Sequence, residues 1–288
     1  MSQRSYTVRE NCELLPFLIA TLGSCSRTTV KSYLTHRQVE VNRRIVSQFN
    51  APLRAGDDVT IFRDRRSALL SHPMLRILHE DEAVVVVDKA SGLLSIGTQK
   101  ERTRTAFYIL SEHVKRTDPA ARIFIVHRLD RDTSGLMVFA KSEDVKRKMQ
   151  LSWNETVRER VYTAVVEGRL SCKEGVVSAR LAENKGHKVF VTDDADAQQA
   201  VTHYRVLRES EDYSLLELHL ETGRKNQIRA HMEYIGHSVA GDAKYGASDN
   251  PIGRVALHAS RLCFVHPVSG RPMDFSLPLP AAFGQMMS

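Results

Sequence analysis

The chain has 288 residues, 42% hydrophobic and 26% charged, a balance typical of a soluble globular protein with one or two domains. No apolar run reaches the ~20 residues needed to cross a bilayer, and the first residues lack the long apolar core of a secretory signal. A cytoplasmic protein without a membrane partner is therefore expected. Four scattered cysteines without metal-binding spacing predict free thiols and no metal site.

The net charge of +7 is concentrated toward the N-terminus. Residues 1–66 hold eleven Lys and Arg against six Asp and Glu, a net charge of +5, whereas the other 222 residues carry only +2. A small basic segment before a nearly neutral large one suggests a nucleic-acid-binding module attached to a catalytic one. Basic surfaces also serve solubility, so charge alone leaves nucleic-acid binding open.

The first predicted elements are two short helices within residues 12–35, separated at Gly23 and Ser24, with Ser26 placed to cap the second. Two strand-like segments follow, QVEVN and DDVTIF, with the turn-rich PLRAGDD between them. A charged and polar stretch then leads to Pro73, where an extended break is expected. The predicted division is a small domain at 1–66, a linker at 67–75 and a large domain at 76–288.

The segments SRTTVKSYL, RQVEVN and PLRAGDDV together resemble the small α/β alpha-L RNA-binding fold of a small-subunit ribosomal protein and some tRNA synthetases. The resemblance covers about 55 residues. It implies that the second helix and the following turn present basic side chains to RNA phosphates. The residues with this implied role are Arg27, Lys31, Arg37, Arg43 and Arg44. A generic helical hairpin with a solvated basic face is the alternative.

Strand-like segments predominate from Pro73 to about residue 280. They read AVVVVDK, RIFIV, GLMVFAKS, RVYTAVVEG, GVVSAR, KVFVT, SLLELHLETG and RLCFVHPVSG. Helical patterns occur near 103–116, 143–152 and 226–236. Because the two kinds of element alternate irregularly, the large domain is predicted to be α+β and built on a mixed sheet.

Residues 123–142, IFIVHRLDRDTSGLMVFAKS, carry the most distinctive pattern in the chain. An apolar strand runs into Asp130, a polar turn follows to Gly135, and a second apolar strand begins. A carboxylate at a strand end between arginines suits a functional group, because rigid neighbours fix it beside a cleft. A structural ion pair or a turn cap would use the same residues, so the pattern alone leaves both roles open.

The string HRLDxxTSG resembles the signature of the RluA-type RNA pseudouridine synthases, with every defining position present. Further segments agree in the same order: ILHEDEAVVVVDKASGLLS, RVYTAVVEG, TGRKNQIRAHMEYIGHSVAGDAKYG and LHASRLCFVHPVSGRPMDFSLPLP. The resemblance covers about residues 75–280. It implies a mixed, largely antiparallel sheet flanked by helices, and conversion of uridine in RNA to its carbon-linked isomer without cofactor or metal.

The resemblance assigns Asp130 as the catalytic nucleophile, which would add to the sugar or the base or remove a sugar proton. Because burial opposes ionisation, a neighbouring cation should stabilise the carboxylate, and Arg229 is the expected partner through a bidentate contact. Tyr162 would stack on the target uracil and assist proton movement at carbon 5. Ile228 would form an apolar wall of the same pocket.

The resemblance leaves two roles open for Arg128 and gives none to His127. Arg128 would either replace the extruded base in the RNA helix or contact a phosphate. His127 is expected to be structural. Two positions depart from the family pattern: Ala90 replaces a usual proline, which is expected to loosen a turn, and Asn226 replaces a common histidine, which puts any supporting contact there in question.

Ribosomal RNA is the favoured partner, because a basic N-terminal module suits a large structured RNA, and transfer RNA is the alternative. A monomer is expected.

Two other functions compete with the enzyme prediction. One is a non-catalytic RNA-binding or ribosome-assembly factor. The other is a glycoside hydrolase that pairs Asp130 with Asp132, although side chains two apart on a turn do not reliably face each other.

Overall fold

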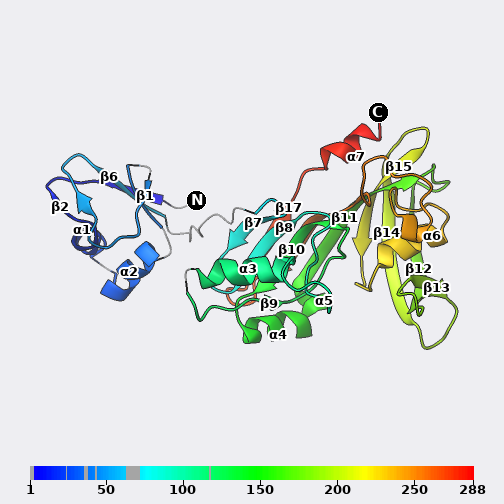
Figure 1. Cartoon of the computed structure of the whole chain (residues 1–288), viewed down its shortest axis with the longest axis horizontal. Helices are drawn as coiled ribbons and strands as arrows, with labels where there is room; N and C mark the ends of the chain where they lie inside the picture. The colour runs from blue at the N-terminus through cyan, green and yellow to red at the C-terminus, as the bar shows by residue number, and fades with distance from the viewer. Residues whose placement is uncertain (1–2, 24, 36–37, 43, 63–71, 117) are drawn as a thin grey trace.

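The structure is a computed structural model that describes residues 3–23, 25–35, 38–42, 44–62, 72–116 and 118–288 (Figure 1). The smaller N-terminal unit contains β1 (Gln3–Thr7), β2 (Cys12–Glu13), α1 (Leu14–Thr21), α2 (Arg27–Thr35), β3 (Val39–Val41), β4 (Arg44–Ile45), β5 (Pro52–Leu53) and β6 (Asp58–Phe62). Its four-stranded sheet has the order β1-β6-β3-β4, and β2 pairs with β5.

The core of the N-terminal unit forms where the two helices meet the sheet. Leu14 and Leu18 lie one helical turn apart on α1, as Val30 and Leu34 do on α2, and all four are buried. The hydroxyl of Ser26 accepts a hydrogen bond from the Thr29 backbone at 3.1 Å, which confirms the predicted helix cap.

The larger unit holds the remaining elements. These are β7 (Leu75–Glu80), β8 (Val84–Lys89), α3 (Ala106–Lys115), β9 (Phe124–Ile125), β10 (Ser134–Ala140), α4 (Glu143–Leu151), α5 (Trp153–Thr156), β11 (Val157–Glu167), β12 (Glu174–Glu183), β13 (Val189–Thr192), β14 (Gln198–Glu209), β15 (Tyr213–Leu220), α6 (Gln227–Tyr234), a 3-10 turn (Ala243–Tyr245), β16 (Leu257–Val265), β17 (Pro272–Ser276) and α7 (Ala281–Gln285). Most of the predicted linker lies outside the described residues, and β7 begins at its last position.

An 11-stranded sheet organises the larger unit, in the order β13-β12-β14-β15-β11-β16-β10-β8-β7, with β17 on β16 and β9 on β10. Its described pairs are antiparallel except for β10 with β16, which run parallel. The prediction of an α+β fold with a mixed, largely antiparallel sheet is therefore confirmed. Within the described residues, no helix combines the length and apolar character needed to cross a bilayer.

The centre of the sheet is buried on both faces. Val84 and Val86 of β8 pack into one apolar cluster with Met149 of α4, whereas Val85 and Val87 pack into another with α3. Successive strand residues point to opposite faces, so an unbroken apolar run can feed two cores at once. This explains why AVVVVDK and GLMVFAKS form strands without polar alternation. The sheet is thereby a rigid support for the loops at its edge.

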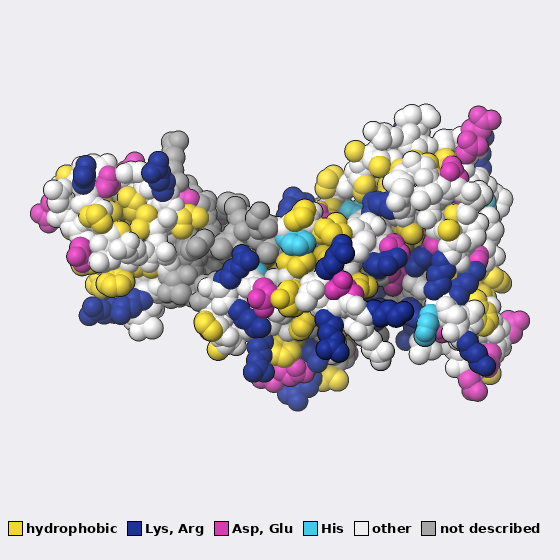
Figure 2. All heavy atoms as spheres, viewed as in Figure 1, with side chains coloured by type: hydrophobic (Ala, Val, Ile, Leu, Met, Phe, Trp, Pro, Cys, Tyr) yellow, Lys and Arg dark blue, Asp and Glu magenta, His cyan; other side chains and the backbone are white. Residues whose placement is uncertain are grey.

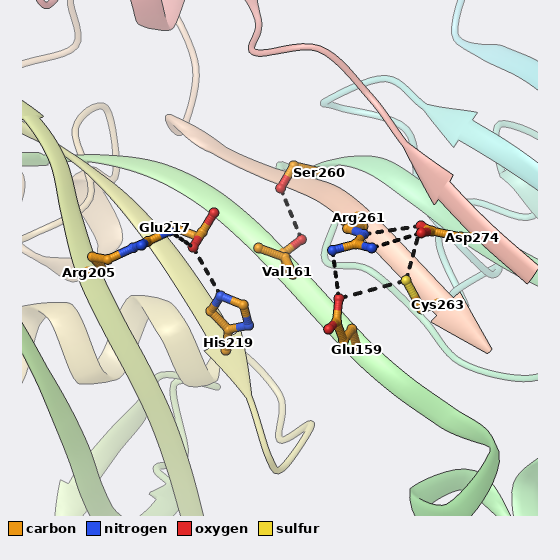
Figure 3. Close-up of polar contacts among 9 residues, drawn as sticks. All are labelled: Glu159, Val161, Arg205, Glu217, His219, Ser260, Arg261, Cys263 and Asp274. Atoms are coloured by element: carbon orange, nitrogen blue, oxygen red, sulfur yellow. Dashed lines mark hydrogen bonds and ion pairs between the residues drawn. The ribbon is translucent and has the colours of Figure 1, made fainter.

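One face of the sheet carries a polar network across β11, β16 and β17 (Figure 3). Arg261 contacts Glu159 at 3.0 Å and Asp274 at 2.8 Å, and the Asp274 carboxylate accepts from the Cys263 thiol at 3.1 Å. A second set of contacts on this face joins Arg205, Glu217 and His219. Burial and the neighbouring carboxylate of Asp274 raise the pKa of Cys263 to about 12, so this thiol remains protonated. The network ties β17 to the sheet.

Candidate active site

The HRLDRDTSG segment forms the loop between β9 and β10, and its last two residues, Ser134 and Gly135, begin β10. Residues 89–95 hold this loop in place. The amide of Gly92 donates to the Arg131 carbonyl at 2.8 Å, and the hydroxyl of Ser91 donates to the Asp132 carbonyl at 2.7 Å. Ser95 both donates to the Leu129 carbonyl, at 2.6 Å, and accepts from the Leu129 amide, at 3.1 Å. The backbone on both sides of Asp130 is therefore fixed by another segment of the chain.

Lys89 completes this support from beneath the loop. Its side chain is fully buried, and Nζ donates to the carbonyls of Ala90 at 3.0 Å, Leu93 at 2.8 Å and Arg131 at 3.1 Å. Burial lowers the pKa of Lys89 to about 8, against the charges of Asp130 and Asp132, which raise it. A buried ammonium with all three protons bonded therefore joins residues 89–95 to the loop.

The glycine of the TSG motif is required by the sheet. Gly135 has a φ of +112°, and a Cβ at this position would lie 2.2 Å from the Ala259 carbonyl oxygen. This close approach occurs where β10 and β16 pair in parallel, at Ser134 with His258 and Gly135 with Ala259. Only glycine allows both the backbone conformation and the contact. The turn after Asp130 is thus anchored to a strand from the C-terminal part of the chain.

A cavity of about 580 Å³ opens above this loop. It brings together the five predicted active-site residues, Arg128, Asp130, Tyr162, Ile228 and Arg229. Other lining residues include His127, Gln150, Trp153, Arg160, Arg224 and Lys225. Cationic lining residues outnumber acidic ones, and Figure 2 shows many Lys and Arg side chains on the face that carries α3, α4 and α6. The cavity suits a polyanion.

Asp130 is half-buried in the wall of this cavity, so it is neither sealed in the core nor freely hydrated. Burial raises the pKa of its carboxyl group, while the charges of Arg229, Arg128 and Lys89 oppose this rise. Within the described residues its carboxylate makes no hydrogen bond. A carboxylate that is partly desolvated and not bonded to the protein is available to a bound substrate.

The raised pKa gives a testable pH dependence. If the carboxylate is the reactive form, single-turnover rates should rise with pH through the pKa of Asp130. Arg128→Gln removes an exposed cation that favours ionisation, so it should raise this pKa further and move the acid limb to higher pH. Arg131→Gln is the control, because Arg131 pairs with Asp132 at 3.2 Å. Equal shifts in both variants would contradict the assignment.

The predicted bidentate contact between Arg229 and Asp130 is wrong. Arg229 binds Asp242 instead, through Nε to Oδ2 at 2.5 Å and Nη2 to Oδ1 at 2.7 Å. Both side chains are almost fully buried, with 8% and 1% exposed. Asp130 and Asp242 cannot both bind the same edge of the guanidinium. Asp242 occupies the edge formed by Nε and Nη2, so Asp130 is left without a bidentate contact to Arg229. Arg229 still lines the cavity and acts on Asp130 through its charge.

Asn226 supports the same arginine. It begins α6 in the left-handed conformation, with φ 51°, which asparagine adopts more readily than most residues. Its side-chain oxygen accepts from Nη1 of Arg229 at 3.1 Å. A supporting contact from this position therefore exists, although the usual histidine is missing. At the other departure, the Ala90 amide donates to the Met74 carbonyl at 2.9 Å, a bond that proline could not make.

Tyr162 stands on β11 at the junction of two apolar clusters and faces the cavity. Burial and the charge of Asp130 raise its pKa to about 12, against the charge of Arg160, so the phenol is neutral. Ile228, 4% exposed, contributes an apolar part of the wall, as predicted from its position before Arg229. Arg128 is exposed at the rim.

His127 is a structural residue of the cavity wall. Its Nε2 accepts from the Val138 amide at 3.1 Å, and its ring lies 5.0 Å from that of Trp153. Burial, with the charge of Arg160, lowers the pKa of His127 to about 3, so the ring is neutral. Asp132 does not line the cavity, which leaves the glycoside hydrolase alternative without its second carboxylate.

The predicted RNA-binding residues of the N-terminal unit are only partly described. Arg27 and Lys31 are exposed on α2, and Arg44 is exposed on β4. Arg37 and Arg43 lie outside the described residues. No group of three or more potential metal ligands occurs within the described chain. All four cysteines are free thiols.

Sequence reasoning missed several residues of the site, above all Lys89, Trp153, Arg160 and Asp242. Lys89 closes a buried run of valines, a place where a lysine needs a reason. Trp153 and Arg160 had no local signal, because they meet the cavity only through the packing of α5 and β11. Asp242 follows a glycine in a loop, and only the fold brings it to Arg229.

Known proteins similar to this chain share one family. Residues 83–234 match the family described as RNA pseudouridylate synthase. A Bacillus subtilis (strain 168) protein named uncharacterized RNA pseudouridine synthase YlyB is 38% identical over 280 residues, covering 94% of this chain and 91% of its own. Ribosomal large subunit pseudouridine synthase D of Zymomonas mobilis is 37% identical, covering 72% and 69%.

A solved structure, human RNA pseudouridylate synthase domain containing 4, superposes with a TM-score of 0.59 at 26% identity and covers 72% of this chain and 90% of its own. The family match spans the loop with Asp130, the strand with Tyr162 and the helix with Arg229. The chain therefore belongs to the RNA pseudouridylate synthase family, whose enzymes isomerise uridine in RNA.

Proposed function

We propose that this enzyme isomerises specific uridines of ribosomal RNA, with Asp130 as the nucleophile and the target base flipped out of its helix. The observation that carries the proposal is the half-buried Asp130 carboxylate, free of hydrogen bonds to the described protein, in a cavity rich in cations. A stacked uridine cannot reach a group at this depth, so extrusion of the base is required.

We expect the reaction to use only groups that line the cavity. The bond between nitrogen 1 and the sugar breaks, the uracil rotates, carbon 5 bonds to the sugar, and the proton on carbon 5 leaves while nitrogen 1 takes up a proton, so that the product is an isomer of uridine. Adding to the sugar, adding to the base and removing a sugar proton all require an ionised Asp130. Tyr162 lines the cavity and its phenol is neutral, which supports its proposed role of stacking on the uracil and assisting the proton transfer.

The other cavity residues would hold the RNA around the target. Arg229 favours ionised Asp130 through its charge, and Ile228 excludes water from one side of the base. Arg128, exposed at the rim, can fill the gap left by the extruded base or contact a phosphate. A non-catalytic RNA-binding factor would have no need of this arrangement around Asp130.

Ribosomal RNA is the proposed substrate because relatives of this chain carry the name ribosomal large subunit pseudouridine synthase D. Pseudouridine should be mapped in total RNA from cells with and without the gene. We expect sites that disappear from large-subunit ribosomal RNA and return with the parent gene, but not with a gene encoding Asp130→Asn. Loss of sites confined to transfer RNA would identify the other substrate. The cytoplasm is the proposed place of action.

The basic N-terminal unit is proposed to be an alpha-L module that holds RNA phosphates, with Arg27, Lys31 and Arg44 exposed for this purpose. Deleting residues 1–66 should weaken binding to a large-subunit ribosomal RNA transcript and reduce its salt dependence, because fewer counterions are released. Filter binding across a salt series measures both effects. An unchanged slope would exclude this unit as the main phosphate-binding surface.

A further inference from the structure

A second cavity adjoins the catalytic one and is not used by the proposed reaction. It has a volume of about 730 Å³ and lies among α3, β9 and α4. Gln150 lines both cavities and so lies at the boundary between them. Its side-chain amide donates to the carbonyl of Val126 at 3.0 Å. Ile125 lines the second cavity and Val126 the catalytic one. The two spaces are therefore neighbours along one surface.

The wall of the second cavity exposes apolar groups that the fold does not cover. Ile96 is 41% exposed and Tyr108 40% exposed, and both line the cavity together with Phe107. On α3 the residues Leu110 and Val114 point into the core, so Tyr108 lies on the outer side of the helix. An exposed aromatic ring beside an isoleucine is a surface on which a nucleobase can stack.

Cations surround this apolar surface. Lys115, Arg122 and Lys146 line the cavity, with Glu112 as the acidic residue among its lining groups. Lys115 and Lys146 pair with acids of their own helices, at 3.5 and 2.9 Å, whereas Arg122 has no ion-pair partner among the described residues. Figure 2 shows dark blue and yellow side chains interleaved over the part of the molecule that carries α3 and α4. This combination matches a phosphate backbone with unstacked bases.

We propose that the second cavity, with Tyr108 and Arg122 as its main contacts, binds a single-stranded segment of the substrate RNA next to the flipped uridine. The proposal rests on the proposed function and deepens it, since it predicts that the enzyme prefers uridines with an unpaired flank. Stacking on Tyr108 is tolerant of sequence, so the cavity would select for strandedness more than for base identity.

The test uses full-length protein carrying Asp130→Asn, so that bound RNA is not converted. Trp153 is the chain's single tryptophan and lines the catalytic cavity, so its fluorescence reports RNA binding. The probes are oligouridylates of about 12 and ~3 nucleotides, because only the longer one can occupy both cavities. Tyr108→Ala with Arg122→Glu should raise the Kd of the longer probe at least about tenfold and leave that of the shorter one within about twofold.

The matched control combines Tyr234→Ala with Arg147→Glu. Both residues are exposed on helices, at 62% for Tyr234 and 71% for the Arg147 side chain, and neither lines either cavity. The control should bind both probes like the parent. Equal weakening of both probes by the Tyr108 and Arg122 changes would overturn the proposal, as would no weakening at all.

Two further results separate this proposal from others. If the Asp130→Asn parent binds the longer probe no more tightly than the shorter one, the second cavity adds nothing to RNA binding and the proposal is wrong, while the proposed function is not affected. If the Tyr108 and Arg122 changes alter the sedimentation coefficient of the free protein but not RNA affinity, the cavity is an interface between copies of the chain, and the proposal is wrong. Tritium release from ribosomal RNA by the wild-type enzyme tests the function independently.

Discussion

Asp130→Asn should reduce tritium release from RNA labelled at carbon 5 of uridine to less than about one thousandth of the parent rate. Asparagine has nearly the same shape but no negative charge, so it can neither add to the sugar or base nor remove a proton. RNA affinity should stay within a few-fold, because the carboxylate makes no hydrogen bond within the described protein and the surrounding cations remain. A filter-binding measurement checks the second half of this prediction.

Asp132→Asn is the matched control for that experiment. Its carboxylate lies in the same loop but outside the cavity, where it pairs with Arg131 at 3.2 Å. Exposed pairs of this kind contribute little to stability, so the control should fold and turn over normally. Turnover near the parent rate in Asp130→Asn, or equal losses in both variants, would remove Asp130 from the chemical step.

Arg229→Ala should lower the free energy of unfolding by about 3–5 kcal/mol and abolish turnover. The change leaves Asp242, which is 1% exposed, as a buried carboxylate without its bidentate partner. It also removes a cation that favours the ionised form of Asp130. Urea unfolding followed by circular dichroism measures the stability loss, and tritium release measures the activity.

A double variant separates these two effects. Arg229→Met with Asp242→Leu replaces a buried ion pair by apolar groups of similar size, which is often neutral for stability. We expect stability to recover substantially while turnover remains lost, because the charge next to Asp130 is still missing. Recovery of both would show that Arg229 serves only to hold α6 and the loop at Asp242.

Local sequence patterns predicted the parts of the fold whose burial is self-evident. The apolar runs at Val84–Val87 and Leu136–Phe139 predicted buried strands, and the structure confirms both as parts of β8 and β10. β14, twelve residues long, was missed because QQAVTHYRVLRE is only half-buried and owes its conformation to pairing with β12 and β15. β1 was missed for a similar reason, since QRSYT becomes a strand by pairing with β6 along its length.

The site could be predicted as far as its motif residues and no further. Asp130, Tyr162 and Arg229 come from three different elements, and only the family resemblance indicated that they meet. The partner of Arg229 was predicted wrongly, because nearness in a pocket does not decide which carboxylate takes the guanidinium fork. The partner of Arg229 is Asp242, a loop residue that nothing in the sequence distinguishes from the other acidic residues of the chain.

The place of β16 in the sheet has a consequence for how the enzyme folds during its synthesis. β16 lies between β10 and β11 and pairs with both, although it follows β11 by about ninety residues in the chain. Until Leu257–Val265 has left the ribosome, no strand that the structure describes joins the strand after Asp130 to the strand that carries Tyr162. Nascent chains and prematurely terminated products that lack β16 should therefore be catalytically inactive, and because β16 pairs across a long separation in sequence, its insertion should be a late event of folding.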